Sequence, residues 1–123
     1  MRYRSPLGRL WHASIYSSRG LRSALRQEQA FEYEAVVLLV VCAVALSAPL
    51  SLWEALAVVG AWLIVMAFEL VNAAVERAFD LIDEGFRPQI QAGKDMLSAA
   101  VFIMVCFNVA LWAALVARRL GLV

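Results

Sequence analysis

Four polar residues interrupt the most apolar stretch of this sequence, and all four fall on one side of a predicted helix. Glu69, Asn72, Glu76 and Asp80 follow the apolar run 52–68 at steps of 3, 4 and 4 residues. Such steps keep the side chains within about one quarter of the helix circumference. A carboxylate at membrane depth is costly unless it is paired or faces a wet cavity. The stripe therefore predicts a functional site, and we expect an enzyme that works at a membrane surface.

Further acidic residues and a lysine lie near the ends of the apolar segments. Hard oxygen ligands suit Mg²⁺, which usually takes one or two protein carboxylates together with substrate phosphates. Phosphoryl transfer needs charge neutralisation, positioning and a group that accepts the hydroxyl proton. A solvated charge cluster at the helix ends is the alternative, and it explains Asp83 and Glu84 equally well. These acidic residues and the lysine are Glu28, Glu32, Glu34, Glu69, Glu76, Asp80, Asp83, Glu84, Asp95 and Lys94.

The composition predicts an all-α membrane protein. The chain has 123 residues, of which 63% are hydrophobic, and three long apolar segments indicate a multi-pass protein with one compact domain, residues 1–123. We expect membrane helices at about 31–48, 52–80 and 95–117. Ser51 and Glu54 have the spacing of a capping box at the start of the second. Asn108 interrupts the third, where an interhelical hydrogen bond explains it better than catalysis.

An amphipathic helix at about 6–28 is predicted to precede the membrane segments and to lie on the membrane surface. Ser5 and Pro6 form a typical helix start, and leucines fall near one face while arginines occupy much of the rest. With the N-terminus inside, 9 of the 11 Lys and Arg residues fall on the inner side and 2 on the outer side. The charge distribution therefore predicts a cytoplasmic N-terminus.

Other familiar catalytic signals are absent from the sequence. It contains no phosphate-binding G-x-x-x-x-G-K-[ST] loop, no H-R-D or D-F-G kinase motif, no G-x-S-x-G and no Cys/His metal pattern. His12 is interpreted as an interfacial residue. Cys42 and Cys106 lie in apolar segments, where small hydrophobic residues are the simpler reading.

Three sequence blocks resemble the prokaryotic diacylglycerol kinase family. The central block runs from Glu69-Leu-Val-Asn72 through Glu76 to Asp80, and a second block reads Gly93-Lys94-Asp95-Met96 followed by Ser98-Ala99-Ala100. The N-terminal elements Gly20-Leu21-Arg22 and Glu28-x-Ala30-Phe31-x-x-Glu34 match as well. The likeness extends over nearly the whole chain, with Ala73, Phe79 and Leu97 as mild departures.

The resemblance implies a homotrimer with active sites shared between subunits in a bacterial inner membrane, with ATP and Mg²⁺ as co-substrate and cofactor. It implies that Glu69 is the general base, that Asn72 helps to order the site, and that Glu28 and Glu76 hold the metal on ATP. The remaining residues that it assigns to ATP are Arg9, Tyr16, Asp80, Glu84, Gly85, Phe86, Arg87, Lys94 and Asp95. Those that it assigns to the lipid, besides Glu69, are Arg22, Phe31, Glu34, Ser98 and Trp112.

Three alternatives to a diacylglycerol kinase remain open at this point. An undecaprenol kinase belongs to the same family, although the segment Lys94-Asp95-Met96-Leu97-Ser98 is nearer the diacylglycerol form. An oligomeric ion or proton transport subunit would use Glu69 as its ion site but has no evident use for a basic surface helix. A non-catalytic assembly factor explains neither the stripe nor Lys94 and Asp95.

Overall fold

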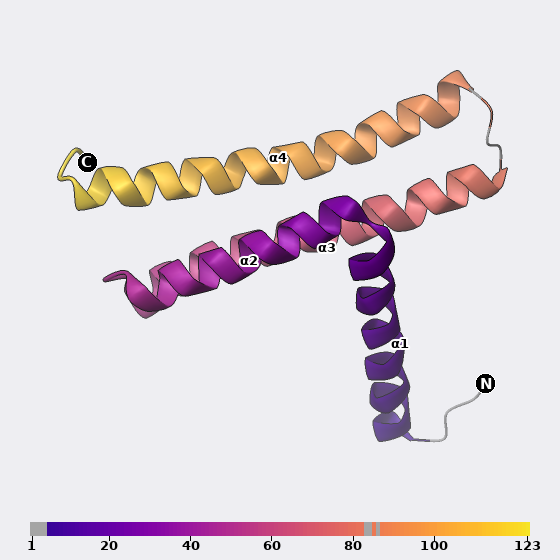
Figure 1. Ribbon diagram of the computed structural model, residues 1–123, viewed down its shortest axis with the longest axis horizontal. Helices are drawn as coiled ribbons and strands as arrows, with labels where there is room; N and C mark the ends of the chain where they lie inside the picture. The colour runs from indigo at the N-terminus through magenta and orange to yellow at the C-terminus, as the bar shows by residue number, and fades with distance from the viewer. Residues whose placement is uncertain (1–4, 83–84, 86) are drawn as a thin grey trace.

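The computed structural model describes residues 5–82, 85 and 87–123, and this part of the chain contains helices and no strands. The helices are α1 (Pro6–Gln27), α2 (Gln29–Ser47), α3 (Leu52–Ile82) and α4 (Pro88–Arg119) (Figure 1). By length and composition, α2, α3 and α4 are each able to cross a membrane. The predicted all-α architecture with three membrane helices and one preceding helix is confirmed.

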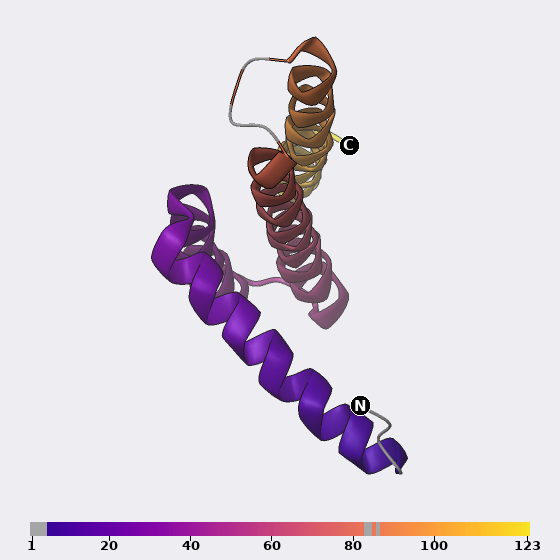
Figure 2. The same cartoon turned by 90° about the vertical axis from the view of Figure 1, so that its right-hand side faces the viewer.

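Helix α1 departs from the other three helices at the α1–α2 junction and projects away from them (Figures 1 and 2). It begins as predicted, because the Ser5 hydroxyl accepts a hydrogen bond from the Gly8 amide at 3.2 Å and Pro6 occupies the first turn. It ends at Glu28, whose extended backbone (φ −114°, ψ 104°) separates α1 from α2. Leu7, Leu10 and Trp11 are exposed, as suits an interfacial helix.

The predicted capping box at the start of α3 is also confirmed. The Ser51 amide donates to Glu54 Oε2 at 2.7 Å, and the Glu54 amide donates to Ser51 Oγ at 3.2 Å. Arg119, in the last turn of α4, donates to the same Glu54 oxygen at 2.9 Å. This contact joins the beginning of α3 to the end of α4.

The third membrane helix starts earlier than predicted, at Pro88 rather than at residue 95. The prediction treated Pro88 as a helix breaker and placed the start of the helix near Gly93, and both were wrong. Proline is favoured in the first helical turn, where no amide hydrogen is needed. Gly93 lies inside α4 and packs against the Phe79 ring of α3. The contact is so close that a Cβ added at Gly93 would lie 2.8 Å from the ring. The glycine therefore serves close helix packing rather than a turn.

Helix α3 is the central element, since it packs against both α2 and α4, while α1 packs mainly on α2. Ala24, Phe31 and Met66 form a core cluster where α1, α2 and α3 meet.

Two polar contacts join α3 to its neighbours. The Trp62 indole donates to the Glu34 carbonyl on α2 at 2.9 Å, and the Asn108 amide on α4 donates to the Ala61 carbonyl at 3.1 Å. The predicted interhelical role of Asn108 is confirmed.

Candidate active site

The polar stripe of α3 passes from the buried interior to the exposed end of the helix. Glu69 and Asn72 are each 9% exposed, Glu76 is half-buried and Asp80 is exposed. One helix thus carries a buried acid and, about 16 Å further along its axis, an exposed one. The stripe therefore leads from the buried middle of α3 to the solvent-exposed end of the same helix.

Carboxylates from three segments converge around Glu69. Glu28 and Glu76 lie close enough to Glu69 to interact with it electrostatically, and Asn72 is its side-chain hydrogen-bonding neighbour. Glu34, on α2, interacts electrostatically with Glu69 from the facing helix. The structure therefore gathers four of the sequence-predicted acids that lie far apart in the chain.

Two acceptor oxygens in this acidic cluster are buried and lack a partner among the described residues. They are Glu34 Oε2 and Asn72 Oδ1. Most buried polar atoms in native proteins are hydrogen-bonded, so each such atom calls for a ligand, a water or another chain. With the carboxylate ionised and the amide oriented as described, both oxygens act as hydrogen-bond acceptors and neither can donate. The cluster thus offers acceptors to a donor that the described residues do not supply.

Arg77 is a functional candidate that the sequence reasoning missed. Its Nε and Nη2 donate to Glu28 Oε1 at 3.0 and 2.6 Å, and its Nη1 lies 3.5 Å from the Ser23 hydroxyl. It thereby ties α3 to the junction of α1 and α2. A cation directly after Glu76, inside an otherwise acidic segment, was the signal that could have drawn attention to it.

A second cation lies at the exposed end of the stripe. Lys94 Nζ on α4 donates to Asp80 Oδ1 at 2.7 Å and is within electrostatic reach of Glu76. Asp95, its neighbour, accepts from Gln91 at 2.8 Å. The structure thus brings Lys94, Asp80 and Glu76 together, as a phosphate-handling site would require. Gly85 and Arg87 precede α4 nearby in the chain, whereas Glu84 and Phe86 lie outside the described residues.

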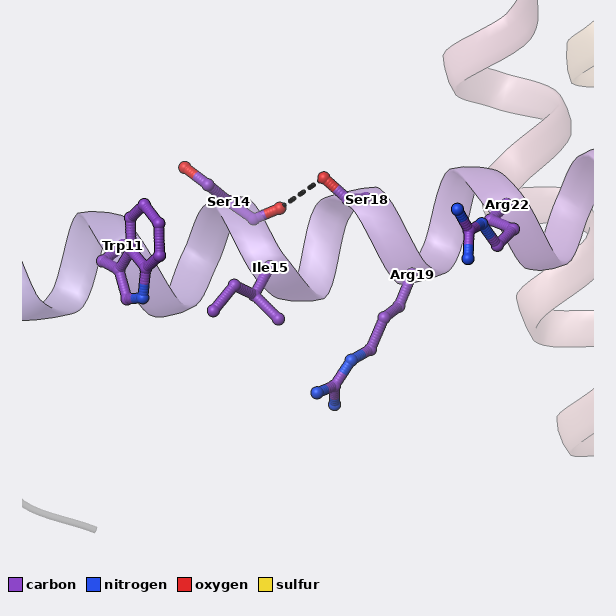
Figure 3. Close-up of a pocket in the computed structure, with 6 residues that line it drawn as sticks. All are labelled: Trp11, Ser14, Ile15, Ser18, Arg19 and Arg22. Carbon is purple, nitrogen blue, oxygen red and sulfur yellow. Dashed lines mark hydrogen bonds between the residues drawn. The ribbon is translucent and has the colours of Figure 1, made fainter.

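Within one chain, the predicted nucleotide residues of α1 do not join this group. Arg9 and Tyr16 belong to the part of α1 that projects away from α3 and α4 (Figure 1). Arg22 lines a shallow groove on α1 with Trp11, Ser14, Ile15, Ser18 and Arg19 (Figure 3). These assignments stay predictions.

The predicted lipid-binding residues have different surroundings. Phe31 is 2% exposed and belongs to the core cluster, so in one chain it packs against protein. Ser98 is exposed on α4. Trp112 lines an apolar cavity with Trp62 and Asn108 between the membrane helices. The lipid contacts of all three also stay predictions.

The donor set suits a metal that arrives with a nucleotide. No group of three His, Cys, Asp or Glu side chains in the described part of the chain is arranged to hold a metal ion on its own. Mg²⁺ usually needs only one or two carboxylates when phosphates complete its coordination. Glu28 and Glu76 are half-buried acids of this kind, and Arg77 uses only one oxygen of Glu28.

Three membrane-length helices, the buried acid Glu69, and half-buried or exposed acids that contact a lysine and an arginine define the chain as a small multi-pass membrane protein with an acidic site. Residues 15–116 match the family model of prokaryotic diacylglycerol kinase. The chain is 31% identical to a diacylglycerol kinase of Escherichia coli K12 over 92% of its length and 93% of the relative. It is 36% identical to one of Helicobacter pylori 26695 over 85% of its length and 81% of the relative. The chain therefore belongs to the prokaryotic diacylglycerol kinase family and is an enzyme of that class.

Proposed function

We propose that this chain transfers the γ-phosphoryl group of ATP to the free hydroxyl of diacylglycerol, giving phosphatidic acid at the cytoplasmic face of the membrane. The observation that carries the proposal is the buried Glu69, which lies at the inner end of a stripe that leads to Lys94. The names of the relatives support diacylglycerol as the acceptor, and the excess of arginines before α2 supports the cytoplasmic face.

The length of α3 supports Glu69 as the residue that meets the lipid hydroxyl. Its 31 residues extend about 46 Å, which exceeds a hydrocarbon core of ~30 Å. If Leu52 lies at the outer boundary of the core, the inner boundary falls near residue 72. Glu69 would then lie about 4 Å inside the boundary and Glu76 about 6 Å outside it. This separates a lipid-facing acid from acids that a soluble nucleotide can reach.

The proposed mechanism divides the work among these side chains. Glu69 accepts the proton of the lipid hydroxyl as the hydroxyl oxygen attacks the γ-phosphorus, the bond from that phosphorus to the β,γ-bridging oxygen breaks and ADP leaves. Asn72 orients the Glu69 carboxylate. Lys94 neutralises charge on the phosphates while Asp80 holds its ammonium group in place. Glu28 and Glu76 would hold Mg²⁺, which supplies charge neutralisation to the phosphates when bound. The buried position of Glu69 keeps water, the competing acceptor, away from the reaction.

We also propose that the site is completed in a homotrimer. Helix α1, which carries Arg9 and Tyr16, projects away from α3 and α4 within one chain, so a neighbouring subunit would have to supply the α1 residues to the nucleotide. Large apolar side chains such as Leu39 (70% exposed) and Phe102 (67% exposed) cover the outer faces of α2 and α4, which suits lipid or further protein.

The test is a phosphorylation assay with the purified full chain, labelled ATP, Mg²⁺ and separate lipid alcohols in mixed micelles. Diacylglycerol is expected to accept the label at a rate well above that of undecaprenol. A preference for undecaprenol would reassign the substrate within the family. No transfer to either alcohol, together with proton or ion flux in liposomes, would replace the kinase proposal by transport.

A further inference from the structure

We propose that Arg77 is a positioning residue that holds Glu28 in the orientation in which its second oxygen, Oε2, binds the metal of Mg-ATP. The inference rests on the proposed function, because it takes Glu28 to be a metal ligand. Arg77 lies on a different face of α3 from the acidic stripe, about 100° around the helix from Glu76. Its role is therefore separate from that of the stripe residues themselves.

The backbone at Glu28 makes such a support necessary. Glu28 lies between α1 and α2 in extended conformation, and its side chain makes no capping hydrogen bond to α2. A long side chain at a junction between two helices has several rotamers open to it. Arg77 restricts them from outside, because its Nε and Nη2 both contact Oε1, at 3.0 and 2.6 Å. Both contacts go to Oε1, so the guanidinium leaves Oε2 of Glu28 available to a metal.

The surroundings of Arg77 hold the guanidinium in turn. It lines a cleft between α1 and α3 whose walls are mostly small residues, including Gly20, Ala24, Ala73 and Ala74. These side chains leave room for the long arginine to cross from α3 to the junction. Nη1 lies 3.5 Å from the Ser23 hydroxyl of α1. Arg77 thus contacts the end of α1 at Ser23 and the bend itself at Glu28, and it holds Glu28 in place relative to α3 and its acids.

Orientation, rather than charge alone, is the expected contribution. A guanidinium near a cation site weakens cation binding by repulsion, so a purely electrostatic role predicts tighter metal binding when Arg77 is removed. Carboxylates that bind metals are usually held by hydrogen bonds from outside, and loss of such a partner typically lowers metal affinity or activity about 10–100-fold. The two roles predict opposite signs for the same substitution.

The experiment measures Mn²⁺ affinity by electron paramagnetic resonance, with a non-hydrolysable ATP analogue and without lipid acceptor, on the full-length chain in detergent. Arg77→Met is expected to weaken Mn²⁺ binding about 10-fold or more. Arg77→Lys should recover only part of the loss, since an ammonium group cannot contact Oε1 through two donors in the same way. Arg26→Met, which removes the same charge from the last turn of α1, is the matched control and should bind Mn²⁺ as the wild type does.

A double-substituted chain decides whether Arg77 acts through Glu28. In the Glu28→Gln background, Arg77→Met should cost little further affinity, because the oxygen that it orients is no longer a ligand. Additive losses would overturn the inference in favour of direct contact between Arg77 and the nucleotide. Unchanged or tighter Mn²⁺ binding by Arg77→Met, with only a lower unfolding temperature, would also overturn it. A wild-type chain that binds Mn²⁺ and the analogue but phosphorylates no lipid would instead refute the proposed function.

Discussion

Replacement of Glu69 by glutamine separates catalysis from folding more clearly than any other single change. Glutamine keeps the shape of the side chain and can still interact with Asn72, but it cannot accept the hydroxyl proton. Loss of a general base usually costs about 10²–10⁴-fold in rate, which corresponds to about 2.7–5.4 kcal/mol in the barrier. We expect the Glu69→Gln chain to lose at least ~10²-fold in turnover with diacylglycerol.

The stability of the same variant should change in the opposite direction. Glu69 is 9% exposed, and the carboxyl groups of Glu28, Glu34 and Glu76 lie close enough to interact unfavourably with a negative charge on it. A neutral amide removes one charge from this group, so the variant should be at least as stable as the wild type, with a gain on the order of 1 kcal/mol. Active-site acids that are strained for function typically show such a trade-off.

The assay combines initial rates of phosphate transfer with thermal unfolding in the same detergent. Glu32→Gln is the matched control, because Glu32 is an exposed acid in the first turn of α2. It should keep most of its activity. Glu69→Gln turnover above about one tenth of the wild-type value would exclude the general-base role. A large fall in unfolding temperature would mean that Glu69 serves the fold rather than the reaction.

Three further experiments test the remaining parts of the site and fold. Glu28→Ala and Glu76→Ala should each lower activity and raise the Mg²⁺ concentration for half-maximal rate, and an unchanged Mg²⁺ titration in both would count against metal binding. Mixed oligomers of Glu69→Gln and Lys94→Ala chains should recover part of the activity if the two residues serve one site from different chains. The second pair to mix is Glu28→Ala with Glu69→Gln. Shared sites would be refuted if neither pair recovers activity in oligomers shown to contain both chains. Asn108→Ala should lower the free energy of unfolding by about 1–2 kcal/mol through the lost interhelical hydrogen bond, and wild-type stability would mean that this bond contributes nothing.

The sequence predicted the helices well where a local signal decides the structure. Hydropathy located the membrane helices, and the caps at Ser5 and Ser51 work through atoms within three residues of each other. The start of α4 was mispredicted because Pro88 was taken to end helical structure and Gly93 to lie at the start of the helix. Proline can end a helix or begin one, and a glycine can lie at a helix terminus or, inside a helix, admit a neighbouring ring. The Phe79 ring that selects the second possibility lies in another helix.

The site was predicted only as far as one helix determines it. The stripe on α3 follows from helical periodicity, so the sequence alone predicts that Glu69, Asn72 and Glu76 share one face of the helix. The contact between Arg77 and Glu28 joins residues 49 positions apart across a bend in the chain, and no local pattern encodes it. The proximity of Glu34 to Glu69 likewise depends on how α2 packs on α3.

The unpartnered oxygens beside Glu69 give a chemical reason to favour a lipid alcohol as the substrate. Glu34 Oε2 and Asn72 Oδ1 are buried acceptors without a donor in the described part of the chain, and an unpaired buried acceptor costs about 1–3 kcal/mol. Diacylglycerol carries one hydroxyl donor at the depth proposed for Glu69, whereas a fully esterified lipid carries none there. The single hydroxyl hydrogen of diacylglycerol can pair with one acceptor of this cluster at a time, which a fully esterified lipid cannot do. Specificity for the alcohol would then arise from the acceptors that surround Glu69, the acid that activates the hydroxyl, because a site built to bind a hydroxyl strongly rejects an analogue that lacks one.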